Sequence, residues 1–111
     1  LSRVAFIAKN ESDRKEKIEM ANEYYSRFDN VFTGPGIVNN GMIEVLPRKQ
    51  SIEELAESLL ICTADEMIDK LSPYQEAGID RVILNMNFGA SHKDTMASIQ
   101  HFAEKVIPHF S

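Results

Sequence analysis

Apolar residues occur along this chain in two patterns, short continuous runs and longer stripes at helical spacing. Residues 3–8 form an apolar run with β-branched and aromatic members, which favours a strand. Residues 59–62, and residues 82–84 within the segment 81–85, are apolar at consecutive positions, as expected of parallel strands that are buried on both faces. The pattern therefore predicts three strands, separated by segments long enough to hold helices.

Helical stripes and capping residues fill the intervals between these runs. Residues 13–28 predict an amphipathic helix, because apolar positions recur on one side and charged ones crowd the other. Capping signatures begin at Ser51, Thr63 and Ser91 and predict three further helices, the first of them short and ending at Ser58. The last helix is expected to bury a stripe made of Met96, Ile99, Phe102, Ala103 and Val106.

Prolines and glycines predict where these elements end. Pro73 should kink or restart the helix that begins after Thr63, and Gly78 suits a left-handed C-terminal cap. Pro108 is expected to stop the last helix. Residues 29–50 contain Gly-Pro-Gly and Asn-Asn-Gly and predict the longest irregular loop of the chain.

Strands that alternate with capped helices define an α/β chain of about three βα units with parallel strands. Such units belong to a doubly wound sheet or to a barrel. A length of 111 residues favours a single domain that covers residues 1–111. Because a three-stranded piece has open parallel edges, we expect it either to form a homo-oligomer or to be part of a longer protein.

Composition excludes some classes of partner. The formal charge of -5, from 12 Lys and Arg against 17 Asp and Glu, is unfavourable for binding nucleic acid. The apolar runs are far shorter than the roughly 20 residues that a membrane-spanning helix needs. Cys62 is the single cysteine, so an internal disulfide and a Cys-x-x-Cys metal site are excluded, and a cytoplasmic location is expected. The three histidines lie too far apart along the chain to predict a metal site.

Four short segments of the sequence carry more specific information than the predicted order of strands and helices: TADEM at 63–67, YQEAGID at 74–80, LNMNFG at 84–89 and FAEKVIPHF at 102–110. They resemble the C-terminal end of the luciferase-like flavin-dependent monooxygenases. Residues 3–14 also resemble the sixth strand of that family and the start of the following helix. The resemblance implies the C-terminal part of a (β/α)8 TIM-type barrel, with the last three of eight βα units present and the first five absent from this chain.

The resemblance also implies an activity. A member of the family would use reduced flavin, most often FMN, and O2 to oxidise a small organic substrate, and a flavin reductase would be a possible partner. The catalytic residues would then lie largely outside these residues and are unknown. The alternative from another class is a non-catalytic flavin-binding or assembly fragment of the same fold.

Candidate site residues lie where the strands end, because barrel enzymes place their chemistry there. Cys62 and Thr63 follow one strand, and Asn85 and Asn87 follow the next, so these four are the predicted cofactor-binding residues. The family usually has Gly-Thr-Pro or Gly-Ser-Pro where this chain has Cys62-Thr63-Ala64, and the side chain of Cys62 therefore restricts close approach of a ligand. Asparagine also suits a strand-to-loop turn, and helix capping alone can explain Thr63.

Overall fold

The computed structural model describes residues 2–48 and 50–110. Its elements, in chain order, are β1 (Ser2–Ile7), α1 (Glu11–Phe32), β2 (Val38–Asn39), β3 (Met42–Ile43), α2 (Ile52–Ser58), β4 (Leu60–Cys62), α3 (Ala64–Glu76), β5 (Ile83–Asn85), α4 (His92–His101), a π-helical turn η1 (Phe102–Val106) and α5 (Ile107–Phe110). The three predicted strands and the helices between them are confirmed as elements.

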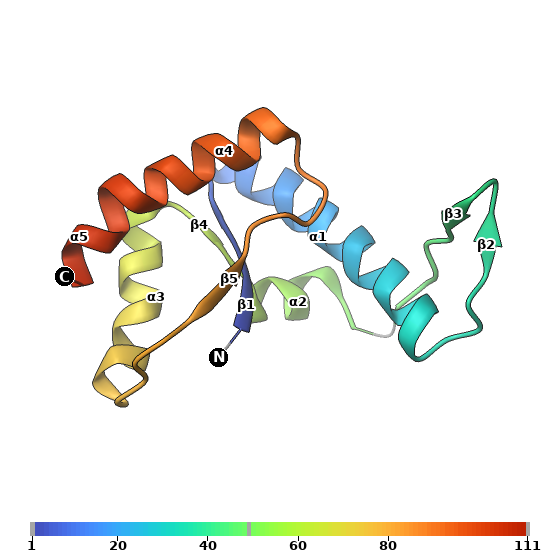
Figure 1. The fold of residues 1–111 in the computed structure, drawn as a ribbon, viewed down its shortest axis with the longest axis horizontal. Helices are drawn as coiled ribbons and strands as arrows, with labels where there is room; N and C mark the ends of the chain where they lie inside the picture. Colours follow the sequence, from blue (N-terminus) through green and yellow to red (C-terminus); the bar gives the residue numbers. More distant parts are fainter. Residues whose placement is uncertain (1, 49, 111) are drawn as a thin grey trace.

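The main sheet has three parallel strands in the order β4-β1-β5, so the first strand of the chain lies in the middle. Figure 1 shows these three strands together in the body of the molecule, with the hairpin β2–β3 projecting away from them at the far end of α1. In β1, Ile7 pairs with Cys62 of β4, whereas Val4 pairs with Asn85 of β5. The strand β5 therefore ends beside Val4 of β1, about three residues before the position where β4 ends.

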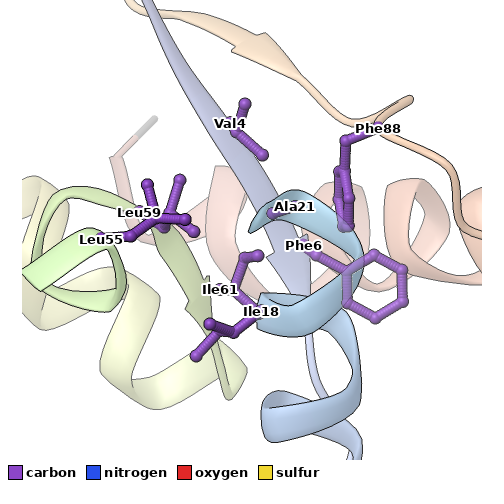
Figure 2. Packing of buried hydrophobic residues seen from close by; sticks show 8 residues of the cluster. All are labelled: Val4, Phe6, Ile18, Ala21, Leu55, Leu59, Ile61 and Phe88. Atoms are coloured by element: carbon purple, nitrogen blue, oxygen red, sulfur yellow. The ribbon is translucent and has the colours of Figure 1, made fainter. Parts of the chain in front are cut away.

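The two faces of β1 carry two separate apolar clusters, because successive side chains of a strand point to opposite sides. Val4 and Phe6 pack with Ile18 and Ala21 of α1 and with residues of α2 and β4. Figure 2 shows this cluster, in which Phe88 lies near Phe6, with their ring centroids 5.9 Å apart and nearly perpendicular.

The opposite face of the sheet packs against α3 and η1. There Ala5 and Ile7 of β1 join Met67 of α3 and Val106 of η1, and all four side chains are buried. Helices thus cover both faces of the sheet, in three layers. A barrel needs strands in sequential order with helices on one side only, so the barrel prediction is not confirmed. The order β4-β1-β5 and the three layers are those of a doubly wound sheet.

The boundaries of α1 and of the loop after it differ from the prediction. The helix runs on to Phe32, and Thr33 ends it by donating both its backbone N–H and its hydroxyl to the Asp29 carbonyl. The segment predicted as irregular from residue 29 therefore begins about four residues later, and it contains the two-residue strands β2 and β3. In the described residues between α1 and α2, these two short strands are the regular elements.

The prediction that β5 is buried on both faces was wrong. The strand is an edge strand of three residues, and 62% of the Ile83 side chain is exposed. An apolar run alone cannot distinguish an edge strand from a central one, because the difference depends on which strand pairs beside it.

The last helix also differs from the prediction. It continues through Pro108 to Phe110. The π-helical turn widens the backbone just before the proline. The proline then lies in the first turn of α5, where a proline is tolerated. Val106 is buried and Phe102 partly buried as expected, but Met96 and Ile99 are exposed. Ala103 is exposed too, since the inner face of α4 runs instead through Ser98.

The predicted cap residues are confirmed. The side chains of Ser51, Thr63 and Ser91 each accept a hydrogen bond from the backbone N–H three residues later. Gly78 has a φ of +86° and follows α3, as a left-handed cap requires. Pro73 does not restart the helix, because α3 is continuous to Glu76. None of the helices in residues 2–48 and 50–110 is long and apolar enough to cross a bilayer.

Candidate functional site

All three strands point their carboxyl ends to one edge of the sheet, where open α/β sheets bind ligands. In such sheets the preferred place is the crevice between two neighbouring strands whose following helices lie on opposite faces. Here β1 is followed by α1 on one face, and its neighbour β4 is followed by α3 on the other. A small cavity of about 130 Å³ lies at the end of β1, in the crevice between α1 and α4.

A buried lysine dominates this crevice. The side chain of Lys17 is only 2% exposed, and its Nζ lies 3.0 Å from Asp13 Oδ1, 3.4 Å from Asp94 Oδ2 and 3.7 Å from Glu16 Oε1. The ammonium group also lies 5.2 Å from the centroid of the Phe6 ring, which adds a cation–π contact. The lysine therefore links the start of α1 to the start of α4.

The charges of this cluster shift each other's pKa. Burial by itself disfavours both charged forms. For Asp13, the hydrogen bonds from the Lys9 backbone N–H and the Lys17 ammonium outweigh burial and lower the pKa of the carboxyl group. For Lys17, the contacts with Asp13, Asp94 and Glu16 outweigh burial and raise the pKa of the ammonium. The lysine stays protonated, and its contacts are with carboxylates of the chain itself.

A second hollow opens between the ends of β1 and β4. It has a volume of about 440 Å³ and is wide open to solvent, and its lining residues are Ile7, Ala8, Lys9, Thr63, Ala64, Asp65, His101 and Lys105. Two lysines and the N-terminus of α3 make this hollow suitable for an anionic group, although Asp65 partly offsets their charge. Its volume falls within the roughly 300–1,000 Å³ range of small-molecule sites.

Thr63 caps the helix at this hollow. Its hydroxyl donates to Glu66 Oε1 at 2.9 Å and accepts from the Glu66 backbone N–H at 3.4 Å. The hydroxyl is thus occupied by the cap.

Cys62 comes just before Thr63 and is fully buried. Burial raises the pKa of its thiol to about 11, and the charge of Glu66 adds to this effect, whereas the charges of Lys70 and Arg14 oppose it. The side chain is therefore a neutral part of the core.

The structure does not bring the four predicted residues together. Asn85 lies on the other side of β1 from Cys62, and its side chain donates to the Tyr24 hydroxyl and accepts from the Asn87 backbone N–H. This arrangement is the strand-to-loop turn that asparagine favours. Asn87 is exposed. A cofactor that contacted all four would have to cross the end of β1.

Several residues of these two hollows were missed by the sequence analysis, namely Lys17, Asp94, His101 and Lys105. The Asp13 and Lys17 pair has the i,i+4 spacing of a helical ion pair, which is a signal in the sequence. The contacts of Asp94 and His101 depend on how α4 packs against β1, which no spacing reveals. Among the described residues, no group of three His, Cys, Asp or Glu side chains is arranged to hold a metal ion.

These features define an α/β chain with a ligand-sized hollow at the carboxyl edge of its sheet. No family model and no solved structure matches the chain. Over its whole length it is similar to the oxygenase component of a flavin-dependent trigonelline monooxygenase from Acinetobacter baylyi, with 26% identity over 118 aligned positions. The chain spans about a third of the length of this curated relative. This likeness supports, as a distant relationship, the class of flavin-dependent monooxygenases.

Proposed function

We propose that this chain is part of a flavin-dependent monooxygenase and that the hollow between β1 and β4 contributes to its flavin site. The observation that carries the proposal is the similarity to a flavin-dependent oxygenase component along the entire chain. The hollow lies outside the carboxyl ends of parallel strands, and this position supports the proposal. The argument applies to an open sheet as well as to a closed barrel.

The residues of the hollow fit one end of FMN better than the other. Lys9 and Lys105 are cations beside the N-terminus of α3, and this combination suits a phosphate group. The lining offers few apolar side chains for the flavin ring, which would need walls from other parts of the protein. When bound and reduced, the flavin would supply the reaction with O2, while these residues bind and orient its phosphate.

The rest of the activity is proposed on the same relationship. A small organic substrate would be oxidised at the carboxyl edge of the sheet, and a separate reductase would supply reduced flavin, since the relative is itself one component of an oxygenase. A cytoplasmic location fits a chain whose single cysteine is a free thiol.

A specific observation favours a second candidate, a non-catalytic flavin-binding or assembly part. The predicted site residues are used by the fold itself, with Cys62 buried, Thr63 capping α3 and Asn85 forming a turn. Under this alternative the chain would bind the phosphate end of the flavin, or a partner, while the reacting atoms lie against other residues.

Titration of the 111-residue chain with oxidised and with reduced FMN, followed by flavin fluorescence and calorimetry, tests the proposal. We expect binding with a dissociation constant of about a millimolar, because the chain holds only the phosphate end of the flavin. Lys105→Ala should weaken it about fivefold, because an exposed charge-assisted contact contributes about 1 kcal/mol. Lys93→Ala is the matched control, since Lys93 is an exposed lysine of α4 outside the hollow. Absence of binding, or equal weakening by both substitutions, would contradict the proposed flavin contact.

A further inference from the structure

The tip of the β2–β3 hairpin is a two-residue turn made of Asn40 and Gly41. Asn39 of β2 pairs with Met42 of β3, and the two residues between them have positive φ, 50° for Asn40 and 77° for Gly41. Asparagine followed by glycine is the sequence that such turns favour, because both positions need a left-handed backbone. Of the seven asparagines in the chain, Asn40 is the one that a glycine follows.

Both turn residues are open to solvent. Every residue from 31 to 43 is exposed. A Cβ atom added to Gly41 would have no heavy atom of the described residues within 4 Å, apart from those of its chain neighbours. In a β-turn the hydrogen bond joins the first and last residues, so the Gly41 backbone N–H lies outside it. Water and hydroxide can therefore reach the Gly41 nitrogen and the Asn40 side chain.

The tip of the hairpin can open while its base stays fixed. The strands β2 and β3 have two residues each, and within the described residues they pair only with each other. A single hairpin of this kind is marginally stable, and segments with few buried contacts open at little cost in free energy. The base is held by the buried side chain of Asn30, whose amide donates to the backbone carbonyls of Ile37 at 2.8 Å and Glu44 at 2.9 Å.

We propose that Asn40 is a site of spontaneous deamidation, in which the Gly41 nitrogen attacks the neighbouring side-chain amide. When the tip opens, the Gly41 backbone nitrogen loses its proton to hydroxide and forms a bond to Asn40 Cγ. The bond between Cγ and Nδ2 breaks, and Nδ2 takes up a proton from water and leaves as ammonia. The product is a five-membered cyclic imide.

Water then opens the imide at one of two bonds. If the bond between Cγ and the Gly41 nitrogen breaks, residue 40 becomes aspartate. If the bond between this nitrogen and the backbone carbonyl carbon of residue 40 breaks, residue 40 becomes isoaspartate, and the chain runs through its Cγ. Either route converts one amide and one water into one carboxylic acid and one ammonia, so neither an oxidant nor a cofactor is needed.

The glycine distinguishes Asn40 from Asn39, which is exposed in the same hairpin. The residue after Asn39 carries a Cβ, which crowds the attacking nitrogen and restricts the backbone. The Asn39 side-chain amide also donates to Glu44 Oε2 at 3.3 Å. Asn39 is therefore a matched internal control for the effect of Gly41.

Deamidation would change the hairpin in two ways. Either product replaces a neutral amide by a carboxylate, which takes the formal charge of the chain from -5 to -6. Isoaspartate also adds a carbon to the backbone, so the two-residue turn between Asn39 and Met42 is lost. The hollow between β1 and β4 is lined by residues outside the hairpin, and the proposal does not rest on the flavin activity.

Incubation of the folded 111-residue chain for several weeks, in mildly alkaline buffer at body temperature, tests the proposal by peptide mapping with mass spectrometry. We expect a gain of about 1 Da at Asn40, because a hydroxyl replaces the amino group of the amide. It should accumulate at least about tenfold faster than at Asn39, a barrier difference of about 1.4 kcal/mol. Gly41→Ala should slow the gain at Asn40 about tenfold, since the added Cβ crowds the nitrogen.

Isoelectric focusing of the aged chain should show a more acidic band. Asn40→Gly should abolish this band, because it removes the reacting amide and leaves a Gly-Gly turn, which suits the same hairpin. Far-UV circular dichroism verifies that both variants keep the fold. The proposal is overturned if Asn40 keeps its amide, if Asn39 reacts as fast, or if the acidic band persists in Asn40→Gly. It is also overturned if Gly41→Ala reacts at the wild-type rate or faster.

Discussion

Ser98 shows how a single small polar residue connects a helix to the sheet. Its side chain is 1% exposed, and its hydroxyl accepts a hydrogen bond of 2.8 Å from the backbone N–H of Ile7, at the end of β1. A larger apolar residue at this point of α4 would fill the same space but leave the Ile7 N–H without an acceptor. The hydrogen bond therefore explains why a polar residue lies on the inner face of α4.

Ser98→Ala should lower the free energy of unfolding by about 1–3 kcal/mol, because it leaves a buried backbone donor unsatisfied. Ser72→Ala is the matched control, since the Ser72 hydroxyl donates only to the Ile68 carbonyl of its own helix, and its loss should cost less than about 0.5 kcal/mol. Urea unfolding followed by circular dichroism measures both. Equal effects of the two substitutions would show that the bond to Ile7 adds nothing.

At the scale of elements, the Lys17 cluster joins α1 to α4 across the end of β1. The pKa of Asp13 is lowered in the folded chain, so its stabilising effect is complete above the unfolded pKa near 3.8 and is lost as the pH falls through the folded value. The pKa of Lys17 is raised, so its effect is complete below about 10.5 and is lost only at higher pH. The cluster is thus intact across the neutral range.

Asp13→Asn should lower stability at pH 7 by about 1–3 kcal/mol, because it removes the charge that lies nearest to a buried ammonium. The loss of stability between about pH 4 and pH 2 should also be smaller in the variant than in the wild type, because the Asp13 contribution is lost below the unfolded pKa of 3.8. Urea unfolding at a series of pH values measures this. Glu53→Gln, an exposed carboxylate in the first turn of α2, is the control. Parallel pH profiles of wild type and Asp13→Asn would contradict the assigned role.

The elements differ in how far the sequence reveals them. Ser51, Thr63, Ser91 and Gly78 act through hydrogen bonds and backbone angles within a few residues, so the helix boundaries they mark were predicted correctly.

Features that depend on contacts between residues far apart in the sequence could not be predicted from local patterns. The exposure of Ile83 depends on the open edge of β5, and the inner face of α4 depends on Ser98 reaching β1. The same limit applies to the site. Thr63 lines the hollow directly after β4, whereas Lys105 and His101 reach that hollow only through the packing of the last helix.

At the scale of the whole molecule, the β2–β3 hairpin projects from the end of α1 that lies away from the sheet (Figure 1). The hollow at the ends of β1 and β4 contains no residue of this hairpin among its lining residues.

The central position of β1 has a consequence for biosynthesis. This strand leaves the ribosome before its two neighbours, β4 and β5, which are translated tens of residues later. At about 5–20 residues per second, on the order of ten seconds pass before both edges of β1 can pair. During that time the apolar residues of β1 are exposed on the nascent chain, and this interval is when a chaperone would protect the protein most.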